Sequence, residues 1–434
     1  MRTIIIVLLL MFSSSCNSEQ TDVLEYVPIR NETDRNIRTL QILPVDTILI
    51  EENEDVIIRD ISSAAVSQDK RFLALSSPGS RQLLIYDYDS GKLVKELYSG
   101  TYLSDSVALS GKKPSEGSYS AEWSGFDWNY ITVKELDKNG QTISDTSKLI
   151  KNMFAEVHFF KNKLFSSAIV YIPAINGLED QHVRLTNLTV LLSYDEKFEI
   201  ERIVIPEDSD FNSGLPYEYI INDRLILTTS NSVVQYTYNI IDSLISIVEY
   251  DLKSGDKLGT VGYLPSSYID SKIGYSMWWQ PKLTEINQEL FVGYPIDSCV
   301  YGKNNVVRFN FKNLPFSNNE GFRLFHEYKK IDFRQRSDLV KKDLLYKIFP
   351  VTLIRLNRMN KNLLAFFSIH DPDSIVGHYY LIQEYSKKGK LLREGKIFND
   401  KSSQIKKILF DNSSNTLLIF RKSQNGWTIQ RNEI

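Results

Sequence analysis

Tryptophan and tyrosine side chains form the most distinctive group of potential binding residues in the sequence. Four of the five tryptophans fall in two close pairs, Trp123 with Trp128 and Trp278 with Trp279, and Tyr275 precedes the second pair. Aromatic faces stack on sugars and anchor protein interfaces, whereas a buried indole N–H needs a hydrogen-bond partner. We therefore expect these five residues to form a surface that binds a protein or a glycan. Packing inside the fold is the structural alternative.

One short segment combines imidazoles with carboxylates. His370, Asp371, Asp373 and His378 could together ligate a transition metal. However, Asp-Pro-Asp-Ser is also an ordinary turn sequence, and Gly377 continues the loop. We expect a solvated loop here, and hence no metal and no cofactor.

Acidic residues offer a second kind of chemistry. Five of them lie ahead of or within strands expected to be innermost in their sheets: Asp60, Glu122, Glu156, Glu218 and Glu285. Converging carboxylates could act in a glycoside hydrolase or a lyase. The sequence lacks the phosphate-binding loop, the dinucleotide-binding glycine motif, the nucleophile elbow and the zinc-peptidase motif. Binding without catalysis is therefore favoured. A glycoside hydrolase or lyase that acts in a central funnel is the alternative.

The elements that must position these residues are clearest in the stretch from Ser63 to Leu97. Turn residues there separate four apolar runs: Ala64–Val66, Phe72–Leu75, Leu83–Tyr86 and Leu93–Leu97. Short apolar runs bounded by Pro, Gly, Asp and Ser are typical of antiparallel strands. Four such strands make a meander, the unit of a β-propeller blade. Because one blade cannot bury both of its faces, several must stack around an axis.

Hairpin signals recur along the rest of the chain, near residues 90, 139, 195, 254, 313, 388 and 425. They predict an all-β propeller of four-stranded antiparallel blades, with seven blades favoured. Six is the alternative, if Tyr102–Leu149 contributes less than a blade. Residues 337–348 have apolar side chains near helical spacing, which indicates a short helix inserted between blades.

The last unit of the chain offers one strand fewer than the first. It holds three strand-like runs: Ile405–Phe410, Thr416–Arg421 and Gly426–Arg431. An unpaired blade edge would expose a row of backbone N–H and C=O groups. The strand-like segment Ile37–Ile50 lies outside the first blade, so we expect it to pair with the last blade and close the ring. Residues 37–434 would then form a single propeller domain.

The first 36 residues read as a targeting segment. Residues 1–15 contain Arg2, an apolar run from Ile4 to Phe12 and three serines, as in a secretory signal, and the run is too short to span a bilayer. Cys16 follows, which resembles the lipobox of bacterial lipoproteins, although Ser13 stands where Leu is usual. The resemblance implies that Cys16 is lipidated and that the protein is anchored in a bacterial outer membrane, facing the periplasm or the cell surface. Residues 16–36 are polar and would form a flexible tether.

Charge and cysteine content narrow the range of partners. The net charge is −3, and 51 basic and 54 acidic residues are mixed along the chain, so we expect no nucleic-acid partner. With Cys16 acylated, Cys299 has no intramolecular partner, and its strand-like surroundings favour a small buried hydrophobe. We expect a monomer.

Two resemblances point to the same architecture. Phe72-Leu-Ala-Leu, Leu83-Leu-Ile-Tyr-Asp87 and the turn Asp89-Ser-Gly-Lys92 resemble a blade of the TolB-like and quinoprotein-like propellers. With its lipobox, the whole chain is similar to uncharacterised propeller lipoproteins of Bacteroides-type bacteria. The blade motif quoted above occurs in many unrelated propellers. The resemblance therefore implies a fold and no particular chemistry.

Overall fold

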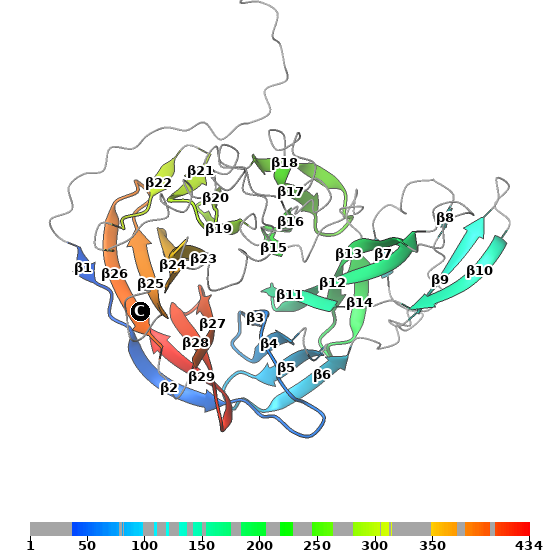
Figure 1. Ribbon diagram of the computed structural model, residues 1–434, viewed down its shortest axis with the longest axis horizontal. Coiled ribbons are helices and arrows are strands. Elements are labelled where there is room, and N and C mark those ends of the chain that lie inside the picture. Colours follow the sequence, from blue (N-terminus) through cyan, green and yellow to red (C-terminus); the bar gives the residue numbers. More distant parts are fainter. Residues whose placement is uncertain are drawn as a thin grey trace, which may run out of the picture.

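Six β-sheets surround a central axis as the blades of a propeller (Figure 1). The computed structural model describes residues 37–77, 80, 82–98, 108–110, 119–120, 130–136, 142–149, 153–174, 184–204, 218–228, 245–263, 281–303, 305–311, 314, 349–370, 378–399 and 404–434. Within these ranges all regular structure is β-strand. The predicted fold class is confirmed, and the number of blades is six, the alternative.

Each blade begins with an inner strand next to the axis and continues outward through antiparallel neighbours. Blade 1 holds β3 (Ser63–Val66), β4 (Phe72–Ser77), β5 (Gln82–Asp87) and β6 (Leu93–Tyr98). Blade 2 holds β11 (Met153–Phe160), β12 (Lys163–Ala174), β13 (Arg184–Tyr194) and β14 (Ile200–Val204). Blade 3 holds β15 (Glu218–Ile221), β16 (Arg224–Thr228), β17 (Ile245–Asp251) and β18 (Lys257–Tyr263).

The second half of the ring follows the same plan. Blade 4 holds β19 (Lys282–Ile286), β20 (Glu289–Gly293), β21 (Cys299–Gly302) and β22 (Val306–Arg308). Blade 5 holds β23 (Val351–Met359), β24 (Asn362–His370), β25 (His378–Tyr385) and β26 (Leu391–Phe398). Blade 6 takes β27 (Gln404–Asp411), β28 (Thr416–Ser423) and β29 (Gly426–Glu433) from the end of the chain.

The segment Tyr102–Leu149 corrects the favoured count of seven blades. Its hairpin forms as predicted, with β9 (Tyr130–Leu136) antiparallel to β10 (Thr142–Leu149), and β8 (Tyr119–Ser120) joins β9. This three-stranded sheet lies outside the ring, beyond blade 2 (Figure 1). The short β7 (Ala108–Ser110) instead pairs in parallel with β14 and becomes a fifth strand of blade 2. The region therefore extends blade 2 and does not form a blade of its own. The helix predicted over residues 337–348 falls outside the described ranges.

The N-terminal segment closes the ring. Strand β2 (Leu43–Leu49) pairs antiparallel with β29 and supplies the fourth strand of blade 6, the pairing that the sequence predicts. Just before it, β1 (Arg38–Thr39) pairs in parallel with β26 of blade 5. The segment thus crosses from one blade to the next along the rim, which was not predicted, because a two-residue parallel pairing leaves no local sequence signal.

Apolar side chains fill the spaces between blades. The cluster at the seam between blades 6 and 1 contains Trp427, which is 1% exposed, and Ile58. The indole Nε1 of Trp427 donates to the carbonyl oxygen of Ile58 at 2.8 Å, so the ring is buried with its N–H satisfied. Lys422 places its Nζ 5.0 Å from the centroid of the same ring and donates to the same carbonyl at 2.9 Å. This seam joins residues far apart in sequence and stabilises the closed ring of blades.

The turn between β5 and β6 lies directly under the closing strand. Gly91 has φ 69°, and an added Cβ would lie 2.3 Å from the carbonyl oxygen of Leu49. The Glu51 N–H donates to the carbonyl oxygen of Gly91 at 3.0 Å. Only glycine satisfies both the left-handed backbone and this close approach. Nearby, Arg431 of β29 donates to Asp46 of β2 at 2.6 Å and to Asp89 of blade 1 at 3.1 Å.

Candidate functional site

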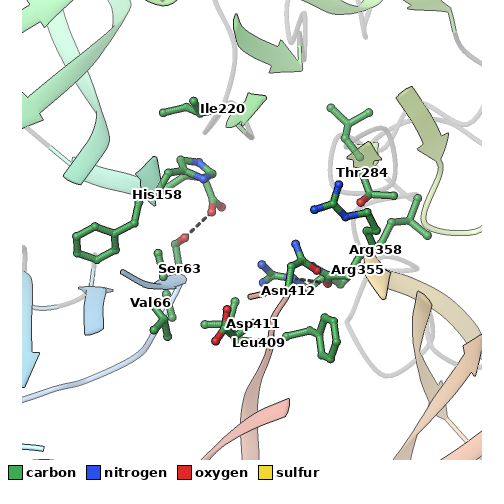
Figure 2. A pocket seen from close by; sticks show the side chains of 18 of the residues that line it. Ser63, Val66, His158, Ile220, Thr284, Arg355, Arg358, Leu409, Asp411 and Asn412 are labelled. Atoms are coloured by element: carbon green, nitrogen blue, oxygen red, sulfur yellow. Dashed lines mark hydrogen bonds between the residues drawn. The ribbon is translucent and has the colours of Figure 1, made fainter. Parts of the chain in front are cut away.

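A cavity of about 480 Å³ runs along the propeller axis. Its lining comes from the inner strands of all six blades: β3, β11, β15, β19, β23 and β27. Figure 2 shows labelled side chains from each of these strands around one open space, among them Ser63, His158 and Arg355. Since every blade contributes, the cavity is a product of ring closure, and no single segment of the chain contains it.

Four charged residues occupy one level of this cavity. Glu156, Lys282, Arg355 and Lys407 all line it, and each lies four residues before the end of its inner strand. Because the first strands of successive blades run in the same direction along the axis, equal positions fall at equal heights. We call these four residues the cation level. Ser63 lines the cavity beside it from blade 1.

Irregular strand pairing marks this level in three blades. The register shifts between Phe154 and Val157 in β11, between Leu353 and Arg355 in β23, and between Ile405 and Lys407 in β27. A β-bulge adds a residue to one strand and re-aims the side chains next to it, and bulges are frequent beside functional sites. Three bulges at the height of Glu156, Arg355 and Lys407 therefore turn these side chains relative to a regular strand.

Hydrogen bonds fix parts of the cation level. The Ser63 hydroxyl donates to Glu156 Oε2 at 2.5 Å, the dashed line in Figure 2, and accepts from the Val157 N–H at 3.1 Å. Arg355 Nε donates to Asn357 Oδ1 at 2.9 Å. Lys407 Nζ donates to the Ser62 carbonyl oxygen across the seam between blades 6 and 1. These contacts hold Glu156, Arg355 and Lys407 at defined positions.

Burial and neighbouring positive charges lower the pKa of both lysines of this level. Burial lowers the pKa of Lys282 to about 8, the negative charge of Glu156 opposes that shift, and the positive charges of Lys407 and Arg355 add to it. Burial likewise lowers the pKa of Lys407, again against Glu156 and together with Arg355. Among the described residues of this level, Glu156 is acidic and the other three are basic.

Near the ends of the inner strands two carboxylates are held by contacts within the protein. Glu285 accepts from Asn222 Nδ2 at 2.6 Å and forms an ion pair with Arg224 at 3.5 Å. Asp411 accepts from the backbone N–H of Ser413 at 2.9 Å and from its hydroxyl at 2.7 Å. We call Asn222, Glu285 and Asp411 the hairpin level. Its acidic groups are occupied by contacts within the protein.

The predicted aromatic site remains untested. Trp123, Trp128, Tyr275, Trp278 and Trp279 all lie outside the described residues, as do Cys16 and Glu122. The described tryptophan, Trp427, is a buried core residue.

The structure separates the acidic residues that were expected to converge in a central funnel. Glu156 and Glu285 line the cavity, whereas Asp60 is not among the lining residues and accepts from the Ser77 hydroxyl at 3.2 Å. Glu218 opens β15, the inner strand of blade 3. Among the described acids, Glu156 and Glu285 therefore line the same cavity, on different levels of it.

The two histidines of the candidate metal segment face each other across a hairpin. His370 and His378 are paired residues of β24 and β25, while Asp371 and Asp373 lie outside the described residues. His378 Nε2 shares a hydrogen bond with the Ser368 hydroxyl at 2.6 Å, and its Nδ1 accepts from Asn399 at 2.7 Å. Burial, followed by the charge of His370, lowers the pKa of His378. Within the described ranges no three His, Cys, Asp or Glu residues gather as metal ligands would.

Cys299 is buried, as the sequence predicts for a small apolar residue in a strand. It is a free thiol and is 4% exposed. Burial raises the pKa of its thiol, with the nearby charge of Asp297 as a second cause. A buried thiol of raised pKa is a poor nucleophile.

Sequence reasoning missed Lys282, Arg355 and Lys407 as site residues. A single lysine or arginine in a strand usually indicates a solvated face, so none of the three stands out alone. The available signal was their common position in the repeat, which becomes visible only after the six inner strands have been aligned.

No family model and no curated protein matches the chain. Among solved structures, a member of the DUF4221 family from Bacteroides vulgatus is 10% identical, with 91% of this chain and 98% of that chain covered and a TM-score of 0.48. A Bacteroides fragilis protein described as exported is 11% identical, with coverages of 92% and 98% and a TM-score of 0.47. The PQQ-bound aldose sugar dehydrogenase of Streptomyces coelicolor is 10% identical, with coverages of 91% and 98% and a TM-score of 0.44. Similarity at this level carries no argument about function. In the part of the chain that is described, no helix is long and apolar enough to cross a membrane.

Proposed function

We propose that this protein is a binding propeller of the bacterial cell envelope that recognises a glycan or a protein and is tethered through a lipid on Cys16. The axial cavity carries the proposal, because all six blades line it and polar groups are fixed within it. Ligand sites are typically concave, preformed and equipped with a few placed polar groups. The cavity has these properties, and the sequence lacks the common catalytic motifs.

The cavity can be blocked without changing the outer surface. Ala65 lines the cavity from β3, whereas Val94 lies on the outer strand of the same blade and is 48% exposed. A glycan array probed with wild-type protein, with Ala65→Trp and with Val94→Trp therefore tests the site. We expect Ala65→Trp to lose the glycans that both other proteins bind. Retention of all glycans by a folded Ala65→Trp protein would show that the cavity is not the binding site.

The aromatic surface remains part of the proposal as a second contact region for the ligand. Replacement of Trp123, Trp128, Trp278 and Trp279 one at a time by Ala should reduce binding while folding persists. A tryptophan in the core would instead cost about 3–5 kcal/mol of stability. If all four variants unfold early in parallel thermal melts, these residues pack between blades and the surface is lost as a candidate.

Lipidation makes an independent prediction about location. Several acyl chains anchor a protein durably, whereas one gives only marginal binding. In a bacterial host, the Cys16→Ala protein should move from the membrane fraction to the soluble fraction and lose labelling by palmitate. Continued membrane association with palmitate labelling would contradict the anchor.

Glycoside hydrolysis is the alternative, because Glu156 and Glu285 line the same cavity. Each glycan that binds can be recovered after prolonged incubation and analysed by mass spectrometry. A binding protein returns the glycan intact. Cleavage that disappears in Glu156→Gln would replace the binding proposal by the enzymatic one.

A further inference from the structure

The outermost strand of blade 6 presents an apolar surface at the rim of the ring (Figure 1). Three large side chains of β2 are more than half exposed: Leu43 at 54%, Val45 at 57% and Leu49 at 59%. Among the residues whose burial is described, no other outer strand of a blade carries more than one such side chain. Single exposed apolar residues are ordinary, whereas a group of them on one edge strand marks an interaction site.

The backbone of β2 also has hydrogen-bonding groups that point out of the sheet. Just after the strand, the N–H of Ile50 donates to the Trp427 carbonyl oxygen at 3.0 Å, so this position turns its backbone groups towards β29. Successive residues of an antiparallel pair alternate, so the backbone groups of Leu49 and Thr47 point away from β29. The turn that contains Gly91 lies against the Leu49 carbonyl oxygen. Around Thr47, within the described residues, β2 is the last strand of its sheet and can accept another.

Two other blades show that the rim of this propeller accepts an added strand. In blade 5, β1 pairs in parallel with the outer strand β26, and in blade 2, β7 pairs in parallel with the outer strand β14. Each of these blades thereby has five strands, whereas the described part of blade 6 has four. The edge of β2 therefore offers the position that a fifth strand occupies in blades 2 and 5.

The two faces of β2 differ in chemistry, which defines the kind of strand that fits beside it. Successive side chains of a strand point to opposite faces, so Thr47 and Leu49 lie on one face and Asp46 lies on the other. On and next to the strand, carboxylates outnumber cations: Asp46, Glu51, Asp89 and Glu433 against Lys92 and Arg431. A complementary strand would present apolar side chains on one face and lysine or arginine on the other.

We propose that the edge of β2 binds an extended segment of a partner protein in which apolar and basic residues alternate, and that the segment adds to blade 6 as a fifth strand. Backbone hydrogen bonds at Thr47 provide affinity, and the exposed apolar side chains and the carboxylates provide selectivity. Two copies of this chain would instead bring two acidic edges together, so complementary charge favours a basic partner. The surface goes beyond the binding proposed for the axial cavity, since β2 contributes no residue to the described lining.

Fluorescence anisotropy with labelled peptides and the full-length protein tests the proposal at fixed ionic strength. The probe is a short peptide of alternating valine and lysine. One control peptide has glutamate in place of each lysine, and the other has proline at its centre, which removes a backbone donor. We expect the valine-lysine peptide to bind about tenfold or more tightly than either control, because charge and backbone pairing both contribute to strand addition.

Variants of the protein locate the binding edge. Thr47→Pro removes an outward N–H at a sheet edge, where proline is tolerated, and should weaken the valine-lysine peptide about tenfold. Leu49→Lys removes an exposed apolar contact, adds a like charge and should have a similar effect. The matched control is Leu258→Lys, because Leu258 is 54% exposed on β18, the outer strand of blade 3. Ala65→Trp should bind the peptide as the wild type does, which separates this edge from the axial cavity.

Four results would overturn the proposal. The first is absence of binding of the valine-lysine peptide by folded wild-type protein, and the second is an equal loss of affinity in Leu49→Lys and Leu258→Lys. The third is a wild-type dimer in analytical ultracentrifugation that Leu49→Lys abolishes, which would assign the edge to a second copy. The fourth is binding to phosphatidylcholine vesicles by the Cys16→Ala protein that Leu49→Lys abolishes, which would assign the apolar side chains to a lipid surface.

Discussion

The seam between blades 6 and 1 and the cation level of the cavity differ in how they arrange charged and polar groups. At the seam, the indole of Trp427 donates to the Ile58 carbonyl, and Arg431 contacts both Asp46 and Asp89. At the cation level, burial and neighbouring positive charges lower the pKa of both Lys282 and Lys407, and the charge of Glu156 opposes that shift. The contrast indicates that the seam stabilises the fold, whereas the cation level holds like charges together in the cavity at a cost to stability. Functional sites are commonly less stable than they could be for this reason.

The largest expected effect belongs to the seam. Trp427→Ala would remove a buried aromatic side chain and leave a cavity where the chain termini meet, at a cost of about 3–5 kcal/mol in the free energy of unfolding. Binding of glycans by the protein that remains folded should be unchanged, since Trp427 does not line the cavity. Urea unfolding followed by tryptophan fluorescence measures the first effect, and the glycan array measures the second. A near-neutral substitution would show that the seam does not carry the stability assigned to it.

Replacement of Gly91 by Ala should have the next largest effect. The new Cβ meets a left-handed backbone, which costs about 1–2 kcal/mol, and it also clashes with Leu49 of the closing strand. Gly255→Ala is the matched control, because Gly255 occupies the same turn of blade 3 with φ 77° and is not covered by β2. Thermal unfolding should show a greater loss for Gly91→Ala than for Gly255→Ala. Equal losses would mean that the closing strand moves away from the new Cβ at little cost in free energy.

The stability of the protein should depend on pH through Lys282. Burial is the largest cause that lowers the pKa of this lysine to about 8 in the folded protein. A lysine whose folded pKa lies below its unfolded value opposes folding while it is charged, so the free energy of unfolding should rise as the pH rises from about 8 towards the unfolded value near 10.4. Lys282→Met should show a shallower rise in urea denaturation, and an identical slope would assign the effect to another group.

The smallest effect is expected for the exposed ion pair of the seam. Hydrogen bonding from Arg431 lowers the pKa of Asp46 below its usual value. A carboxyl group with a depressed pKa contributes stability above its unfolded pKa, near 3.9, and loses that contribution as the pH falls through the lower folded value. Arg431→Met should therefore lower stability by less than about 1 kcal/mol near neutral pH, and the difference should shrink below about pH 4. A difference that stays constant down to about pH 2 would exclude the ion pair as its source.

Local sequence signals predicted most of the ring. Alternating apolar runs with Asp, Ser, Gly and Pro between them located the strands of blade 1, and the missing strand of blade 6 identified the closing segment 37–50. The number of blades was wrong because the hairpin of β9 and β10 has the same local signal as a blade hairpin. Whether such a hairpin joins the ring depends on distant packing, which the local pattern does not contain.

The site was less predictable than the fold. The acidic residues Glu156 and Glu285 were singled out and do line the cavity, but the three cations were passed over. Arg355 and Lys407 stand beside bulges, and a bulge shifts side-chain direction without a sequence signal of its own. The convergence of Lys282 with them depends on ring closure, a property of the whole chain.

The unfolding free energy of Lys282→Met, measured by urea denaturation without any ligand, tests the central claim most directly. If the cation level exists for a ligand, loss of one of three neighbouring like charges should leave stability unchanged or raise it slightly, as often happens when a buried charge is replaced by an apolar side chain. If Lys282 instead belongs to a structural network, the substitution should cost about 3 kcal/mol or more, because it would leave a buried opposite charge without its partner. The first result supports a cavity that is built for binding, and the second contradicts it.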